Sequence, residues 1–209
     1  DGVILQPTGL PGDSIELLRR ADIPVVCIDS KPEGVPYWVA TNNYEATREA
    51  VKACLASGYR RCLLLSAEPN LLTSRQERFQ GCLDAAKAAG VPCSESIINA
   101  ETPPEEIHSM VEQSLSEKTL VFVPNCWLLP KIFQALAPLH VQIPERLGVL
   151  GFDNEEWAGF SVPSVSTIVQ PAFQEGATAA ALLIDNIRSK PNIPANATLD
   201  CEIVLRGST

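Results

Sequence analysis

The chain contains 209 residues, of which 45% are hydrophobic, and its 25 acidic residues outnumber its 16 basic residues to give a formal net charge of −9. This length suits one large domain or two small lobes with cores of their own. The acidic balance, without a block of consecutive basic residues, argues against direct binding to nucleic acid or to an anionic membrane surface. No stretch approaches the roughly 20 apolar residues that span a bilayer.

The seven cysteines are scattered along the chain, form no CxxC pair and in several cases lie inside apolar runs. They predict reduced, buried thiols in a cytoplasmic protein rather than a disulfide framework. With only two histidines, His108 and His140, and no cluster of cysteine and histidine, the sequence predicts no metal site.

Short apolar runs alternate with helical segments along the chain. Strands that are apolar almost throughout are typical of a parallel sheet covered by helices on both faces, and the alternation of strand and helix predicts a doubly wound α/β fold. In chain order, the predicted strands are residues 3–5, 23–29, 62–67, 95–100, 120–124, 147–153, 165–170 and 201–205.

The segments between these runs have the spacing of amphipathic helices. One helix has a face formed by Thr47, Val51, Cys54 and Leu55. The long helix before residue 190 has a face formed by Phe173, Ala177, Ala180, Ile184 and Ile187. The segment 190–198, KPNIPANAT, is predicted to be a loop because it is rich in Pro and Asn.

The number of predicted strands indicates two lobes. Residues 1–57 are predicted to form a partial N-terminal lobe, and residues 58–170 a C-terminal lobe with a complete α/β layer. Residues 171–209 supply a crossover helix and a final strand, which can return to either lobe.

Several motifs keep a fixed order along the whole chain: DGVIL, IPVVCID, TNN and SRQERFQGC come first, followed by IPERLGVLGFD, STIVQP and a closing RGST. From residue 1 to residue 209 this series resembles the effector-binding core of the lactose/galactose-repressor (LacI/GalR) family of bacterial transcription regulators. The resemblance implies a two-lobed fold like that of the periplasmic binding proteins. It also implies that the N-terminal lobe is incomplete, because a DNA-binding headpiece, a hinge helix and two β-α units precede the first matched strand in the family.

The resemblance implies a homodimeric repressor core that senses a sugar or sugar acid between its lobes and reaches operator DNA only through the headpiece. GFDNEEW and STIVQPAFQEG resemble the gluconate and ketogluconate regulators of the family, and two arginines near one pocket, Arg75 and Arg78, favour an anionic ligand such as gluconate or 2-ketogluconate. The alternative is a periplasmic sugar-binding protein of an uptake system, since fold alone does not decide function. Without a Gly-rich phosphate loop, a GxSxG motif or a nucleophile–base–acid set, we expect neither an enzyme nor a cofactor.

Polar residues that directly follow predicted strands are candidate ligand contacts, because open parallel sheets bind ligands beyond the carboxyl ends of their strands. Gln6, Asp29, Asn125 and Asp153 satisfy this rule. Carboxylates and amides form hydrogen bonds with sugar hydroxyls, whereas the alternative role of each residue is in a turn or cap. The resemblance implies ligand contacts for Asn125 and Asp153.

Arg75 and Arg78 lie three residues apart in SRQERFQG and therefore share a helical face near a helix start. Two guanidiniums there suit an anion or a set of hydroxyls, while the alternative is a solvated arginine paired with Glu77 or Asp84. The resemblance implies that Arg78 is the effector-binding arginine. Ser74 supplies a hydroxyl in the same loop.

Five further positions have two interpretations each. The resemblance places Gln170 at a crossover between lobes, as a ligand contact or a hinge residue. Trp127 either stacks on a sugar ring or packs between helix and sheet. Trp157, Phe160 and Val162 are candidates for the dimer interface, with core packing as the alternative.

Overall fold

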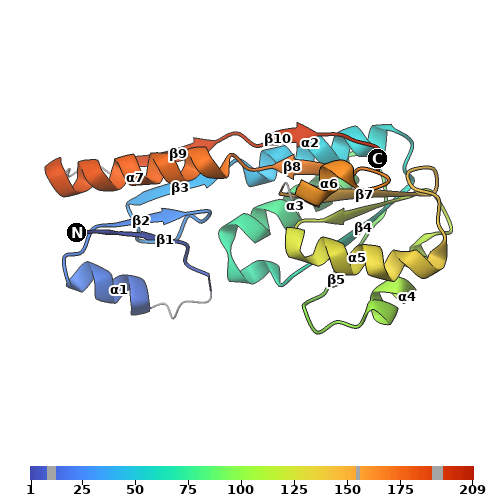
Figure 1. Ribbon diagram of the computed structural model, residues 1–209, viewed down its shortest axis with the longest axis horizontal. Helices are drawn as coiled ribbons and strands as arrows, with labels where there is room; N and C mark the ends of the chain where they lie inside the picture. Colours follow the sequence, from blue (N-terminus) through green and yellow to red (C-terminus); the bar gives the residue numbers. More distant parts are fainter. Residues whose placement is uncertain (9–12, 154–155, 190–194) are drawn as a thin grey trace.

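The N-terminal lobe is built on a four-stranded sheet in a computed structural model that describes residues 1–8, 13–153, 156–189 and 195–209 (Figure 1). All pairings are parallel, in the order β1 (Val3–Leu5), β2 (Val25–Ile28), β3 (Tyr37–Thr41) and β9 (Ala195–Leu199). Helix α1 (Asp13–Arg20) lies on one side of the sheet and α7 (Ala172–Ser189) on the other (Figure 1).

The C-terminal lobe contains a six-stranded sheet in the order β10 (Glu202–Val204), β8 (Ser166–Val169), β7 (Leu147–Phe152), β6 (Thr119–Val123), β4 (Arg61–Ser66) and β5 (Cys93–Ile97). Only β10 runs antiparallel among these strands. Every residue of β6 and β7 is buried, as the uninterrupted apolar runs predict. The expected doubly wound α/β fold with two lobes is confirmed.

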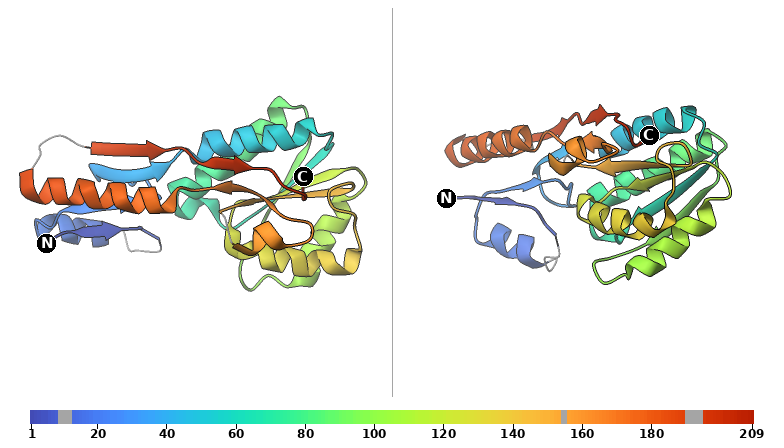
Figure 2. Two further views of the ribbon diagram at one scale, coloured as in Figure 1. Left: turned by 45° about the horizontal axis from the view of Figure 1, so that its top comes forward. Right: turned by 45° about the vertical axis from the view of Figure 1, so that its right-hand side comes forward.

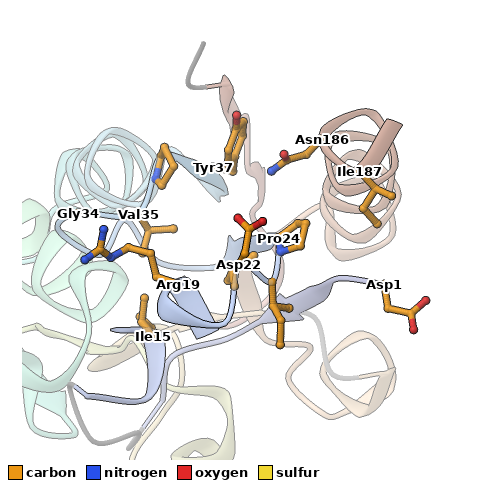
Figure 3. Close-up of a pocket in the computed structure, with 13 residues that line it drawn as sticks. Asp1, Ile15, Arg19, Asp22, Pro24, Gly34, Val35, Tyr37, Asn186 and Ile187 are labelled. Atoms are coloured by element: carbon orange, nitrogen blue, oxygen red, sulfur yellow. The ribbon is translucent and has the colours of Figure 1, made fainter. Parts of the chain in front are cut away.

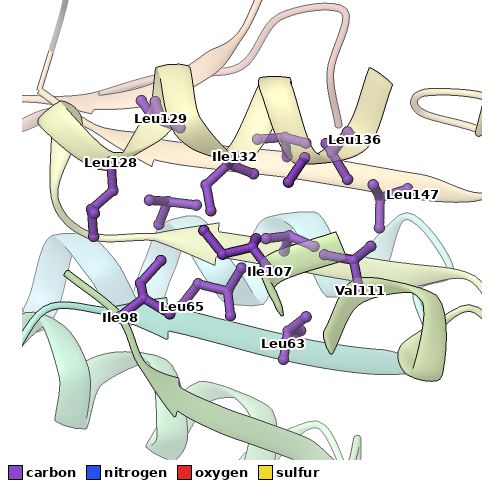
Figure 4. Packing of buried hydrophobic residues seen from close by; sticks show 14 of the residues in the cluster. Leu63, Leu65, Ile98, Ile107, Val111, Leu128, Leu129, Ile132, Leu136 and Leu147 are labelled. Atoms are coloured by element: carbon purple, nitrogen blue, oxygen red, sulfur yellow. The ribbon is translucent and has the colours of Figure 1, made fainter. Parts of the chain in front are cut away.

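Helices cover both faces of the six-stranded sheet. Helices α4 (Pro104–Ser114) and α5 (Leu129–Leu136) pack on one face, and Figure 4 shows their side chains interdigitating with those of the strands. Helices α2 (Asn43–Ala56) and α3 (Thr73–Ala88) supply the apolar side chains on the opposite face. Short helix α6 (Glu156–Phe160) follows β7. Within the described residues, no helix combines the length and apolarity needed to cross a membrane.

The chain passes between the two lobes three times (Figure 2). The first passage leads from β3 into α2, the second from β8 into α7, and the third from β9 into β10. The face of α2 formed by Thr47, Val51, Cys54 and Leu55 is buried, and its apolar members pack in the C-terminal core. Residues 43–56 therefore lie in the C-terminal lobe, whereas the expected boundary after residue 57 placed them in the N-terminal lobe.

Strands β3 and β9 are absent from the predicted set and pair with each other along their whole length, from Tyr37 opposite Ala195 to Thr41 opposite Leu199. Residues 190–194 lie outside the described part of the chain. The loop prediction for residues 195–198 is wrong, because pairing with a partner far away in sequence outweighs a weak local strand signal.

Helix α7 turns its most apolar stripe away from the sheet. Phe173 is 92% exposed, and Ile184 and Ile187 are exposed as well. The buried contacts come from the opposite stripe, where Glu175 and Ala179 are buried and Leu182 and Leu183 pack against the N-terminal core. An apolar stripe normally faces the core, but α7 has two stripes with helical spacing, and only packing on the sheet decides between them.

The closing motif RGST holds the C-terminal end against the six-stranded sheet. The buried Ser208 hydroxyl donates to the carbonyl of Val149 in β7 at 2.5 Å and accepts from the backbone N–H of Ser166 in β8 at 2.8 Å. The Arg206 guanidinium donates to the carbonyl of Val165 at 2.7 Å. The motif therefore satisfies polar groups at the beginning of β8 and within β7.

Two glycines in helix interiors are predicted to respond oppositely to alanine. A Cβ on Gly81 in α3 would lie 2.7 Å from the Tyr44 carbonyl oxygen in α2, whereas a Cβ on Gly176 in α7 meets nothing within 4 Å. We expect Gly81→Ala to lower the free energy of unfolding by about 1–3 kcal/mol through overpacking. Gly176→Ala is expected to raise it by about 0.5–1 kcal/mol through helix propensity.

Chemical denaturation of both variants measures this difference. Equal effects of the two substitutions would contradict the close approach of α2 and α3 at Gly81.

Candidate functional site

The carboxyl ends of the parallel strands in both lobes point toward the middle of the molecule (Figure 1). Gln6 and Asp29 follow β1 and β2 in the N-terminal lobe. Asn125, Asp153 and Gln170 follow β6, β7 and β8 in the C-terminal lobe. The post-strand residues selected from the sequence are thus presented by two sheets that face each other.

Arg78 occupies the centre of this region and is 5% exposed. Its Nε donates to Asn43 Oδ1 at 2.7 Å, its Nη1 donates to the carbonyl of Pro124 at 3.1 Å, and its Nη2 lies 3.4 Å from Asp29 Oδ1. The guanidinium also lies 3.7 Å from the centre of the Phe152 ring. Arg78 therefore links α3 to the loop after β6 and joins the C-terminal lobe to the N-terminal lobe.

The two acids considered as surface partners of Arg78 have other contacts. Glu77 forms an ion pair with Lys31 at 2.7 Å, and Asp84 accepts a hydrogen bond from the hydroxyl of Tyr44 at 2.9 Å. The side chain of Arg75, half-buried on α3, forms no hydrogen bond or ion pair with any other described residue. The two arginines thus differ: Arg78 is fully engaged, and Arg75 is held by no described polar partner.

Asp29 is held in a left-handed conformation, with φ of 53°, at the end of β2. Its Oδ2 accepts from Gln6 Nε2 at 2.9 Å, and its own N–H donates to Glu175 Oε1 at 2.8 Å. Burial raises the pKa of the Asp29 carboxyl, while Arg78 and hydrogen bonds from Gln6 and the buried Ser74 hydroxyl act in the opposite direction.

Asp153 also has a left-handed backbone conformation, with φ of 69°. Its Oδ1 accepts from Gln170 Nε2 at 2.5 Å, and Gln170 Oε1 accepts from the Thr41 hydroxyl of β3 at 3.0 Å. This chain of hydrogen bonds connects the two lobes at a second point. Gln170 therefore lies at a crossover, between a candidate ligand carboxylate and the other lobe.

Asn125 and Trp127 are placed differently by the short helix η2 (Cys126–Leu128). Asn125 is buried, and its Oδ1 accepts from the backbone N–H of Ala67 at 2.9 Å, which ties the loop after β6 to the loop after β4. Trp127 is 46% exposed, so it does not pack between helix and sheet.

Sequence reasoning missed three residues of this cluster. Asn43 and Phe152 contact Arg78 directly, and the carboxylate of Glu175 is buried beside Asp29. The signal for Asn43 lay in TNN, a pair of amides directly after a strand. Glu175 had no local signal, because it lies on a helix whose apolar spacing drew attention to other positions.

The three candidates for a dimer interface are not equally exposed. Trp157 packs edge-on against Phe133 of α5, with ring centres 5.8 Å apart, as part of the C-terminal core. Phe160 is 74% exposed and Val162 is 98% exposed. Core packing thus accounts for Trp157, while Phe160 and Val162 present apolar surface to solvent.

A separate cavity of about 610 Å³ lies in the N-terminal lobe (Figure 3). Its lining includes Val25 and Tyr37, which begin β2 and β3, together with Arg19, Asp22 and Asn186. It therefore opens at the amino ends of the strands, opposite to the polar cluster. Ligands of parallel sheets bind at the carboxyl ends, so this cavity is not our candidate site.

Negative charge exceeds positive charge in the cluster around Arg78. Burial raises the pKa of Glu175, and the neighbouring Asp29 and Asp153 carboxylates act in the same direction, while the hydrogen bond from the Asp29 N–H and the charge of Arg78 oppose them. A carboxyl whose pKa is raised in the folded state stabilises the fold below its ordinary pKa of 4.5, and this contribution is lost as the pH rises through the raised value.

We therefore predict that Glu175→Gln raises the Tm at pH 7, because the amide keeps the acceptor for Asp29 N–H without a buried charge. The difference from the wild type should shrink below pH 4.5, where Glu175 is protonated. Thermal unfolding from pH 4 to pH 8 measures this, with Glu202→Gln, at an exposed position of β10, as the control for net charge. A Tm difference that does not change with pH would contradict the prediction.

The two-lobed α/β fold with polar residues gathered between its sheets defines the class of periplasmic-binding-protein-like domains. A family model described as a periplasmic binding protein-like domain matches residues 51–209. The chain belongs to this family, and its relatives are regulators of the LacI type, which confirms the resemblance drawn from the motifs.

Among curated relatives, the HTH-type transcriptional regulator KdgR of Bacillus subtilis (strain 168) is 26% identical over 214 residues, covering 100% of this chain and 63% of KdgR. The transcriptional repressor CytR of Escherichia coli (strain K12) is 28% identical, covering 100% of this chain and 62% of CytR. A solved LacI family regulator from Enterococcus faecium with bound ribose superimposes with a TM-score of 0.86 at 24% identity, covering 100% of this chain and 79% of that one.

The chain thus spans less than two thirds of the length of these curated relatives. The relatives are transcriptional regulators, which confirms the expectation of a non-enzymatic family. They do not favour the alternative of a periplasmic sugar-binding protein of an uptake system.

Proposed function

We propose that this chain is the effector-binding core of a LacI-type transcriptional regulator and that a sugar binds between the lobes at the cluster around Arg78. The observation that carries the proposal is that Arg78 of the C-terminal lobe is held by Asp29 of the N-terminal lobe, among residues that follow strands of both sheets. Such a position makes a bound molecule sensitive to the relative orientation of the lobes.

The charges of the cluster favour a neutral, polyhydroxylated ligand over a sugar acid. Asp29, Asp153 and Glu175 interact with one another electrostatically around Arg78, which is the one buried cationic side chain in the described part of the chain. Carboxylates accept hydrogen bonds from sugar hydroxyls but repel a ligand carboxylate. The bound ribose in the Enterococcus faecium structure supports the same preference.

Gluconate or 2-ketogluconate remains the second candidate, and Arg75 favours it. Its guanidinium lies on the same helix as Arg78 and has no polar partner among the described residues. Arg75 could therefore form an ion pair with a ligand carboxylate and balance its charge. Arg78 could not, because its guanidinium is already engaged with protein partners.

The mechanism that we propose is a shift in population between two lobe orientations. A ligand changes this equilibrium only by its difference in affinity for the two states. The Arg78–Asp29 pair and the Thr41–Gln170 hydrogen bond both cross between lobes, so a sugar that replaces or strengthens them would favour one orientation. In a cytoplasmic homodimer with Phe160 and Val162 near its interface, the change would alter the spacing of two headpieces on operator DNA.

Calorimetry with ribose, glucose, gluconate and 2-ketogluconate tests the proposal on the protein as its gene encodes it. We expect binding of a neutral sugar that is abolished in an Arg78→Met variant. Binding of the sugar acids alone would overturn the preference for a neutral ligand. Binding that survives the loss of Arg78 would overturn the location of the site.

A further inference from the structure

Three cysteines from three different elements meet at one edge of the six-stranded sheet. Cys62 of β4 and Cys93 of β5 are direct partners in the parallel register, so their side chains point to the same face. Cys82 reaches that face from α3, and its sulfur lies 3.8 Å from that of Cys62. All three sulfurs lie within 4.8 Å of one another.

All three cysteines are free thiols, and the spacing of their sulfurs suits a shared metal ion. A separation of 3.8 Å is nearly twice the S–S bond of about 2.05 Å. Because the three sulfurs lie within 4.8 Å of one another, a point within roughly 2.8 Å of all three exists between them, which is close to the Zn–S distance of about 2.3 Å. An ion at the centre would contact all three sulfurs with little movement of the protein.

The burial of the three sulfurs and the charge of three thiolates limit which metal ions the cluster could bind. Cys62 and Cys82 are fully buried among apolar side chains, and Cys93 is half-buried on the edge strand β5, which gives a route from solvent. Three thiolates carry a charge of −3, so a divalent ion leaves −1 in an apolar environment where a monovalent ion would leave −2. Uncompensated charge is costly there, and thiolates select soft ions.

We propose that Cys62, Cys82 and Cys93 form a three-thiolate site for a thiophilic divalent cation of the zinc group, such as Zn²⁺ or Cd²⁺. Water completes the coordination on the side of Cys93, as in zinc sites with three protein ligands. Binding converts three thiols to thiolates and releases three protons to solvent, so the affinity increases with pH. The site is separate from the cluster around Arg78 and does not depend on the proposed function.

The sequence predicted no metal site, because these cysteines have no ligand-motif spacing and only the packing of α3 on β4 and β5 brings them together.

Titration of the reduced protein with Cd²⁺ tests the proposal. We expect one Cd²⁺ per chain, an ultraviolet sulfur-to-cadmium charge-transfer band, displacement by Zn²⁺ and a higher Tm with the metal bound. In Cys93→Ser the affinity should fall by more than the roughly 10- to 100-fold that the loss of an outer-shell partner costs. Absence of the band in the wild-type protein, or an unchanged affinity in Cys93→Ser, would overturn the proposal.

Two further variants separate loss of a ligand from loss of the fold. Cys126→Ser, at a half-buried cysteine outside the cluster, should bind Cd²⁺ like the wild type. Cys82→Ala should keep a cooperative thermal transition but lose the rise in Tm that Cd²⁺ causes. A rise in Tm equal to that of the wild type would show that the metal binds elsewhere and would also overturn the site.

Discussion

Replacing Arg78 with methionine is expected to lower the free energy of unfolding by about 3–5 kcal/mol, the range seen when one partner of a buried ion pair is removed. The side chain is 5% exposed and contacts Asn43, the Pro124 carbonyl and Asp29. Because the site is buried, water does not take the place of the guanidinium as the donor to these three acceptors. The carboxylates of Asp29 and Glu175 would remain buried without their cation. Chemical denaturation at pH 7 measures the change.

Arg75→Met provides the matched control on the same helix. Because Arg75 has no polar partner among the described residues, its replacement is expected to change the free energy of unfolding by less than about 0.5 kcal/mol. Arg78→Lys should fall between the two, since lysine keeps the charge but not the planar fork that reaches three acceptors at once. Equal stability of Arg78→Met and Arg75→Met would disprove the central role of Arg78.

Replacing Asp153 with asparagine is expected to weaken sugar binding by about 10- to 100-fold with little change in Tm. Hydrogen bonds to charged groups contribute about 1.5–3 kcal/mol, and the amide loses that charge. Asparagine tolerates the left-handed conformation at φ of 69° and still accepts from Gln170, so the fold is preserved. Calorimetry with whichever of the four compounds binds the wild-type protein measures the affinity.

Asp22→Asn is the control for this prediction. Asp22 also has a positive φ, of 52°, but it is exposed and lines the cavity at the amino ends of the strands. Its replacement should leave the affinity unchanged. If Asp22→Asn weakened binding and Asp153→Asn did not, the ligand would bind in that cavity and the site between the lobes would be wrong.

The amino-acid sequence determined the class of fold and the edge of each sheet at which the polar cluster forms. Strands β6 and β7 are apolar at almost every position because helices cover both of their faces. Gln6, Asp29, Asn125 and Asp153 were found from the sequence because every parallel strand presents its carboxyl end at the same edge. Both properties are local, since each depends only on the order of residues within one strand and its following loop.

The tertiary structure alone decided what these residues meet. Glu175 and Asn43 enter the cluster from helices that begin just after the chain crosses between lobes, and Cys82 joins Cys62 and Cys93 only when α3 packs on the sheet. Contacts with elements distant in sequence also decided which stripe of α7 is buried and that β9 pairs with β3. The physical reason is that periodicity describes the faces of one element, whereas a contact depends on which face a distant element covers.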